Sequence, residues 1–173
     1  MTAPDIDFVT HFIPDPRALF EQLKASVSWD ERMRARKTAS FGLPYDYSQI
    51  SYPAVPMPEA LERLCPAIEQ LLGFRPNNCQ LNFYPDGQSS MGFHSDANEQ
   101  LVPGTGVVVI SLGYARSMLF KHKQSGRIHE YNLGAGSLLH MSDALQTQWL
   151  HAIPKAPGAG ERISLSFRQL QDR

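Results

Sequence analysis

The hydrophobic and polar positions of the chain follow two different periods, and the change falls near residue 78. Two apolar stripes with helical spacing precede that point: Leu19, Leu23 and Val27, and then Leu61, Leu64, Ile68 and Leu71. Asp15 and Pro16, directly before the first stripe, are typical of a helix start. The second stripe predicts a helix that begins at Pro58.

From residue 78 onward, short apolar or alternating segments are separated by Gly and Pro. The segments are 78–84, 107–113, 116–122, 127–133, 136–141 and 162–168. Alternation predicts strands with one buried face, and many short strands joined by turns favour a β-sandwich or jelly roll. The sequence therefore predicts an α+β fold in a single domain, 1–173, with helices in 1–77 and a strand core in 78–170.

Composition narrows the class of protein. The chain has 173 residues, of which 42% are hydrophobic and 19% charged, as in ordinary globular proteins. Its 16 Lys and Arg residues and 17 Asp and Glu residues give a net charge of −1, which excludes a strongly basic nucleic-acid-binding coat. Contact with nucleic acid would then depend on a local patch, and the basic residues within 32–37 and 121–123 are the candidates.

Membrane and cysteine patterns bear on where the protein works. No apolar run approaches the length of a membrane span, and the first residues lack the basic and apolar regions of a secretion signal. Cys65 and Cys79 are too few for a disulfide framework, so we expect both to be reduced. We therefore expect a cytoplasmic protein that makes no membrane contact.

The segment GFHSDANEQ offers a candidate metal site. His94 and Asp96 are two residues apart, so on a strand their side chains point to the same face. His151 is the best candidate for a third ligand, and His140 is an alternative. Two histidines and one carboxylate form the facial triad of non-haem Fe(II) oxygenases. There is no cysteine near His94, which argues against a structural zinc site.

The last predicted strand carries two arginines on one face. Ile163, Leu165 and Phe167 alternate with Arg162, Ser164, Ser166 and Arg168. The two arginine Cα atoms would lie about 20 Å apart on a straight strand, too far to hold one carboxylate together. They would bracket a longer dicarboxylate if both side chains lean inward, whereas an amphipathic strand with a solvated face is the ordinary alternative.

Four segments resemble the AlkB family of Fe(II)- and 2-oxoglutarate-dependent dioxygenases, in the family's order. They read NFYPDGQSSMGFHSD, VVVISLGYARSMLFKHK, GSLLHMSDALQTQWLHAIPK and ERISLSFR, and the resemblance spans roughly residues 40–170. The resemblance implies a double-stranded β-helix (jelly roll) core with N-terminal helices and a short nucleotide-recognition lid.

The resemblance also implies roles for particular residues. It implies that Fe(II) is held by His94, Asp96 and His151, and that 2-oxoglutarate is contacted by Asn82, Tyr84, Arg162, Ser164 and Arg168. Arg162 matches the arginine of the distal carboxylate, and Arg168 lies near the iron-chelating end. Ser164 departs from the family's frequent Asn. The implied substrate contacts are Tyr45 and Tyr47 of the lid and Asn98, which stands where the family often has an acidic residue.

The activity implied is oxidative dealkylation of N-alkylated bases in DNA or RNA, which is direct-reversal repair. It consumes 2-oxoglutarate and O2 and releases an aldehyde, succinate and CO2. The lean N-terminal part favours a single-stranded alkylated nucleic acid as partner, and we expect a monomer. A 2-oxoglutarate oxygenase acting on a protein or small molecule is the alternative, favoured by the net charge and by Asn98. A non-enzymatic jelly-roll binding module is a third hypothesis.

Overall fold

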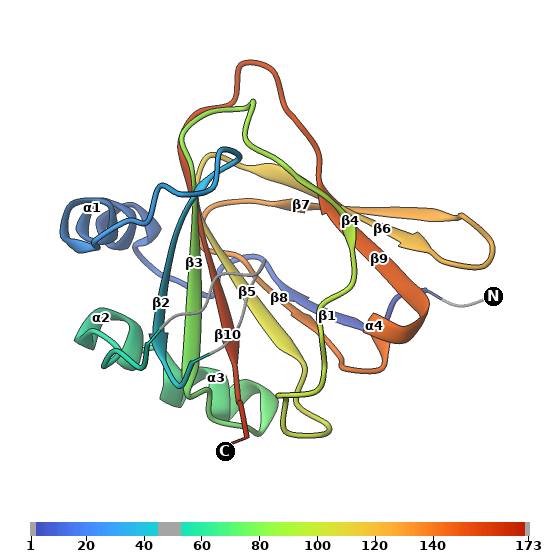
Figure 1. Cartoon of the computed structure of the whole chain (residues 1–173), viewed down its shortest axis with the longest axis horizontal. Helices are drawn as coiled ribbons and strands as arrows, with labels where there is room; N and C mark the ends of the chain where they lie inside the picture. The colour runs from blue at the N-terminus through green and yellow to red at the C-terminus, as the bar shows by residue number, and fades with distance from the viewer. Residues whose placement is uncertain (1–2, 45–52, 172–173) are drawn as a thin grey trace.

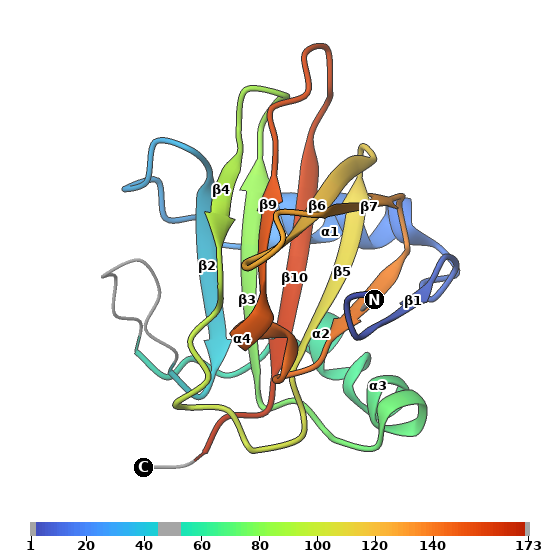
Figure 2. The same ribbon diagram turned by 90° about the vertical axis from the view of Figure 1, so that its right-hand side faces the viewer.

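Two antiparallel β-sheets face each other at the centre of the structure, a computed structural model that describes residues 3–44 and 53–171 (Figures 1 and 2). The strands are β1 (Ile6–Val9), β2 (Lys37–Gly42), β3 (Asn78–Tyr84), β4 (Met91–His94), β5 (Val107–Gly113), β6 (Arg116–His122), β7 (Ile128–Leu133), β8 (Leu138–Met141), β9 (Trp149–Ile153) and β10 (Arg162–Arg168). One sheet has the order β1-β8-β5-β10-β3-β2 and the other the order β4-β9-β6-β7. This arrangement is the predicted jelly roll.

The main difference from the expected organisation lies before residue 78. Strands β1 and β2 both belong to the six-stranded sheet, although only helices and a lid were predicted within 1–77. Strand β1 alternates only over Ile6, Asp7 and Phe8, and β2 has no apolar alternation. The segment KTASFG forms β2 because its whole backbone pairs with β3, from Lys37 opposite Phe83 to Gly42 opposite Asn78.

The helices are α1 (Pro16–Ser26), α2 (Glu59–Glu62), α3 (Cys65–Leu72) and α4 (Leu145–Gln148). Helices α1, α2 and α3 lie on the outer side of the six-stranded sheet (Figure 1). The single helix predicted from Pro58 is wrong, because α2 ends at Glu62 and a new helix begins two residues past Arg63. Pro66 has no N–H to continue a helix and is tolerated only in a first turn, which is where α3 places it. No helix in the described ranges is long and apolar enough to span a membrane.

The side chains of β10 alternate between the two faces of the six-stranded sheet, as the sequence predicts. Ile163, Leu165 and Phe167 are fully buried in the core under the helices. The other face, with both arginines, lines a cavity between the sheets. The remaining space between the sheets is filled by a second apolar cluster that includes Val109 and Phe120. The polar face of β10 is therefore interior, and the solvated alternative does not apply.

The start of α1 gives a test of stability that is separate from the site. The Asp15 carboxylate accepts a hydrogen bond from the Ala18 amide at 3.2 Å, as expected for a helix cap. Asp15→Ala is expected to lower the free energy of unfolding by about 1 kcal/mol, measured by urea denaturation. Asp15→Asn, which keeps the acceptor oxygen, is the matched control, and equal losses in both variants would contradict a capping role.

Candidate metal centre

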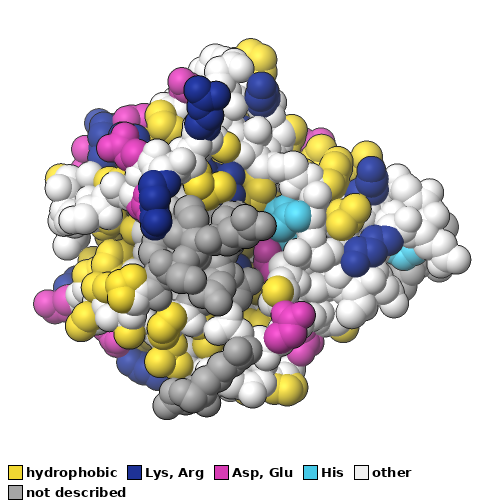
Figure 3. Space-filling model, in the orientation of Figure 1, with side chains coloured by type: hydrophobic (Ala, Val, Ile, Leu, Met, Phe, Trp, Pro, Cys, Tyr) yellow, Lys and Arg dark blue, Asp and Glu magenta, His cyan; other side chains and the backbone are white. Residues whose placement is uncertain are grey.

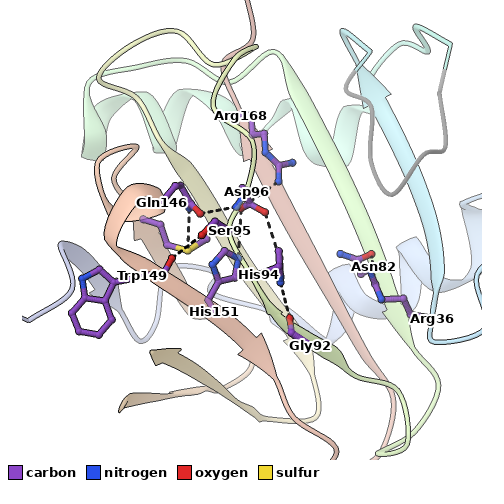
Figure 4. A network of polar contacts seen from close by, with 11 residues as sticks. Arg36, Asn82, Gly92, His94, Ser95, Asp96, Gln146, Trp149, His151 and Arg168 are labelled. Atoms are coloured by element: carbon purple, nitrogen blue, oxygen red, sulfur yellow. Dashed lines mark hydrogen bonds and ion pairs between the residues drawn. The ribbon is translucent and has the colours of Figure 1, made fainter. Parts of the chain in front are cut away.

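His94, Asp96 and His151 converge on one point between the sheets (Figure 4). Their possible ligand atoms all lie within 4.8 Å of one another. The two carboxylate oxygens of Asp96 face the two rings, at 3.5 Å from His94 Nε2 and 3.6 Å from His151 Nε2. The convergence arises from the strand register, since β4 pairs with β9 so that His94 stands directly opposite His151.

Asp96 reaches the cluster in a different way from that expected. Strand β4 ends at His94, so the two residues do not share one strand face. Instead, the Asp96 amide donates to Gln146 Oε1 at 2.7 Å, and the Ser95 hydroxyl donates to the Trp149 carbonyl at 2.9 Å. These two bonds fix the chain just beyond β4 against the segment that leads into β9 (Figure 4).

The hydrogen bonds also orient the rings. His94 Nδ1 lies 2.8 Å from the Gly92 carbonyl, which only accepts, so Nδ1 carries a proton. Nε2 is the nitrogen that faces Asp96 and is the one available to a metal ion. A second group that fixes the ring of a metal-binding histidine in this manner is common at metal sites.

Burial and neighbouring charges leave the cluster ready to bind a cation. Burial raises the pKa of the Asp96 carboxyl, but its contact with His94 and its electrostatic interactions with His151 and Arg168 outweigh burial and hold the pKa well below its usual range. Burial lowers the pKa of His151 to about 4, despite Asp96. Burial alone would lower the pKa of His94, yet Asp96 raises it above its ordinary value. Asp96 is therefore ionised and His151 neutral at neutral pH.

His140 is not part of this cluster. Its Nε2 lies 2.6 Å from the Thr105 carbonyl, and its Nδ1 lies 3.4 Å from Asp7 on β1. The alternation of LLHM had made His140 an alternative ligand. In the structure, His140 lies on β8 directly opposite Asp7 of β1. The prediction of His140 as an alternative third ligand is therefore wrong, and His151 is the second histidine of the cluster.

The cavity extends from the cluster along the polar face of β3 and β10. Its polar lining includes Asn82, Tyr84, Arg162, Ser164 and Arg168, and Val107, Val109, Met118, Met141 and Ile153 supply apolar walls. The structure thus brings together the three expected metal ligands and the five residues expected around the co-substrate.

Arg162 is the most unusual of these residues. Only 1% of it is exposed, and its guanidinium lies over the Tyr84 ring at 4.9 Å. Its Nη2 donates to the Ser111 hydroxyl at 3.0 Å, but Nε and Nη1 have no hydrogen-bond partner in the described part of the chain. A buried cation with spare donors is costly unless an anion completes it, so the site fits a carboxylate.

Arg168 lies at the other end of the same strand face. Its Nη2 is 3.8 Å from the Asp96 carboxylate, so it borders the cluster directly (Figure 4). The two arginines therefore occupy opposite ends of one cavity, as the expected bracket for a dicarboxylate requires.

Two further side chains, one that lines the cavity and one that contacts its lining, were missed. Arg36 belongs to the basic run that was expected to contact phosphates, yet it is only 6% exposed, and its Nε donates to Asn82 Oδ1 at 3.1 Å. Gln80 lines the cavity and is 1% exposed. The alternation of NCQLNFY, which puts Gln80 on the face of Asn82 and Tyr84, was the signal that would have found it.

Of the three residues expected to contact the substrate, the structure describes only Asn98. Asn98 does not line the cavity, and its Nδ2 donates to the Asp143 carbonyl at 3.0 Å. Tyr45 and Tyr47 lie outside the described residues. The roles of all three residues, and the lid itself, stay predictions.

Comparisons with known proteins agree with this geometry. A family model described as the 2OG-Fe(II) oxygenase superfamily matches residues 16–168. "DNA oxidative demethylase ALKBH2" of Bos taurus is 31% identical over 147 residues, covering 78% of this chain and 53% of that protein. "Alpha-ketoglutarate-dependent dioxygenase alkB homolog 3" of Rattus norvegicus is 31% identical over 174 residues, covering 87% of this chain and 58% of that protein. The chain thus spans little more than half the length of these relatives.

Solved structures support the fold alone. "The structure of OsALKBH1" superposes with a TM-score of 0.68 at 18% identity, covering 98% of this chain and 100% of that one. A prolyl-4-hydroxylase of Pseudomonas putida superposes with a TM-score of 0.63 at 19% identity, covering 98% of this chain and 95% of that one.

Proposed function

Because the chain belongs to the AlkB family of Fe(II)- and 2-oxoglutarate-dependent dioxygenases, we propose that it oxidatively removes N-alkyl groups from bases in DNA or RNA. The observation that carries the proposal is the single cavity in which a His-Asp-His cluster and a buried arginine with spare donors meet. The relatives named as a DNA oxidative demethylase and an alkB homolog favour a nucleic-acid substrate.

The residues of the cavity fit the cofactors of the family. Two imidazoles and a carboxylate are the donor set that suits Fe(II) with positions left open for other ligands. His94, Asp96 and His151 would hold the iron. Arg162 would pair with the distal carboxylate of 2-oxoglutarate through Nε and Nη1, which satisfies its spare donors.

The remaining co-substrate contacts follow from the same face. Asn82 and Ser164, opposite each other on β3 and β10, would contact the middle of 2-oxoglutarate. Arg36 holds Asn82 Oδ1, so the amide nitrogen of Asn82 is the group directed to a ligand. Arg168 would add positive charge at the iron-chelating end.

Bound iron, 2-oxoglutarate and O2 supply the oxidation, in which the N-alkyl carbon is hydroxylated and then leaves as an aldehyde. The chain's own part is to bind and orient. The apolar walls formed by residues such as Met118 and Ile153 exclude water from the ligands. No side-chain general base is required by this chemistry.

The nucleic acid would reach the cavity past a small basic patch, defined here as Lys121, His122 and Lys123 at the end of β6. Lys121 Nζ lies 4.7 Å from the ring centre of Phe93, an exposed residue that directly precedes His94. In Figure 3, basic side chains (dark blue) lie over the β6–β7 hairpin, to the right of a histidine (cyan) and an acidic side chain (magenta). We propose that this patch binds a backbone phosphate.

Replacement of Lys121 tests this patch. Lys121→Ala is expected to raise the KM for a methylated oligonucleotide at unchanged kcat, and to reduce the slope of log KM against log salt by about one. Lys24→Ala is the matched control, since Lys24 pairs with Glu161 away from the cavity. An unchanged salt slope in Lys121→Ala would remove the patch from the interface.

We further propose a single-stranded alkylated nucleic acid as partner, and a monomer in the cytoplasm. The two cysteines are free and buried, in keeping with a reducing compartment.

The function is tested with purified protein, Fe(II), 2-oxoglutarate and air, with and without an oligonucleotide that contains 1-methyladenine or 3-methylcytosine. We expect formaldehyde and succinate to form together only with the methylated oligonucleotide. Succinate that no oligonucleotide stimulates would contradict the nucleic-acid substrate and direct the search to proteins and small molecules. No succinate under any condition would contradict the enzyme assignment.

A further inference from the structure

Gln80 is a buried polar side chain without a partner. It is 1% exposed, and neither its Nε2 nor its Oε1 has a hydrogen-bond partner in the described part of the chain. Buried amide groups are nearly always hydrogen-bonded, so an orphaned one calls for an explanation. Since the side chain lines the cavity, the missing partner is a molecule that occupies the cavity.

The strand register fixes which end of the cavity Gln80 faces. Gln80 stands opposite Ser166 on β10 and opposite Ser40 on β2. Tyr84 and Arg162, which face each other at the far end, are four residues away along their strands, or about 13 Å. Arg168 is only two residues beyond Ser166 and borders Asp96. The amide therefore lies at the end that holds the metal cluster.

The chemistry at that end identifies the ligand. If Arg162 pairs with the distal carboxylate, the 2-oxo-carboxylate end of 2-oxoglutarate would extend toward His94, Asp96 and His151. Its oxygens are acceptors, and Gln80 Nε2 has two N–H donors available. We propose that Gln80 donates a hydrogen bond to the 2-oxo-carboxylate end of 2-oxoglutarate and positions it for chelation. This inference rests on the cofactor set of the proposed function and on no property of the nucleic acid.

A positioning role and a structural role make opposite predictions for stability. An unpaired buried amide destabilises the empty protein, so its replacement by an apolar side chain of similar length removes that cost. Gln80→Met is therefore expected to melt at the same temperature as the wild type or higher in the empty state. A glutamine that supported the fold would instead lose stability on the same substitution.

The experiment is an anaerobic calorimetric titration of the Fe(II)-loaded protein with 2-oxoglutarate, together with thermal melts of the metal-free protein. We expect Gln80→Met to raise the dissociation constant about tenfold, as for the loss of one hydrogen bond to a charged group. Iron binding should be unchanged. Gln80→Glu, which places a negative charge beside the carboxylate, is expected to weaken binding further. The exposed Gln22, on α1, gives the matched control Gln22→Met, which should bind as the wild type does.

The possible results separate the inference from the proposed function. An unchanged dissociation constant in Gln80→Met, or a lower melting temperature with undiminished 2-oxoglutarate binding, would overturn the role of Gln80. Failure of the wild type to bind 2-oxoglutarate would overturn the cofactor assignment instead. The titration contains no nucleic acid, so its interpretation does not depend on whether the protein demethylates an oligonucleotide.

Discussion

His151→Ala is expected to lose stoichiometric Fe(II) and to reduce turnover to background. Its Nε2 is one of three ligand atoms that converge within 4.8 Å, and the other two cannot complete a facial triad without it. Even residues that only support metal ligands typically contribute 10–100-fold in affinity, so removal of a ligand should exceed about 100-fold. Metal content after dialysis against Fe(II), measured by atomic emission, checks the first effect.

His140→Ala is the matched control for that experiment. The residue is also a histidine on a sheet, but its ring nitrogens face Thr105 and Asp7 rather than Asp96. We expect this variant to retain stoichiometric iron. Loss of iron in His140→Ala with retention in His151→Ala would reverse the ligand assignment.

Arg162→Leu is expected to abolish the preference for a dicarboxylate co-substrate. Breaking a buried ion pair by removing one partner costs about 3 kcal/mol or more, which is a rise of about 150-fold in the dissociation constant of 2-oxoglutarate. The reason is that Nε and Nη1 of Arg162 are buried donors with no partner in the described part of the chain, and they lie at the end of the cavity away from the metal cluster. Anaerobic calorimetry on the Fe(II)-loaded protein measures the change.

A ligand-side control makes the Arg162 test specific. 2-Oxopentanoate has the same chelating end and chain length but no distal carboxylate. The wild type should bind it far more weakly than 2-oxoglutarate, whereas Arg162→Leu should bind the two acids with similar affinity. If the variant still prefers 2-oxoglutarate by the wild-type margin, another residue holds the distal carboxylate. Arg162→Lys should lie between the two, because lysine keeps the charge without the paired donors.

Strong local patterns made part of this fold predictable. The alternation of β10 identified both of its faces, and the segments 78–84, 107–113 and 116–122 coincide with β3, β5 and β6. Each of these strands has a neighbour on both sides in its sheet, so its apolar or alternating residues directly reflect burial. Asp15 likewise marked the start of α1, because a capping side chain acts on its own next turn.

Features that depend on distant partners were not predictable. Strand β4 has four residues, one of them Gly92, and exists because it pairs with β9. The same pairing decides between His151 and His140, since only His151 stands opposite His94. Asp96 reaches the cluster because its own amide and the Ser95 hydroxyl donate hydrogen bonds to Gln146 and Trp149, which no spacing around His94 reveals. Gln80 was missed because its unusual property is a missing partner, which is visible only in three dimensions.

The central claim is that one cavity couples 2-oxoglutarate turnover to demethylation of a nucleobase. The most direct test is the molar ratio of formaldehyde to succinate formed on a 1-methyladenine oligonucleotide, with intact-mass analysis of the same oligonucleotide. The account predicts a ratio near one, conversion of the methylated base to adenine, and neither product with His151→Ala. Succinate without formaldehyde, on an oligonucleotide that keeps its methyl group, would contradict it.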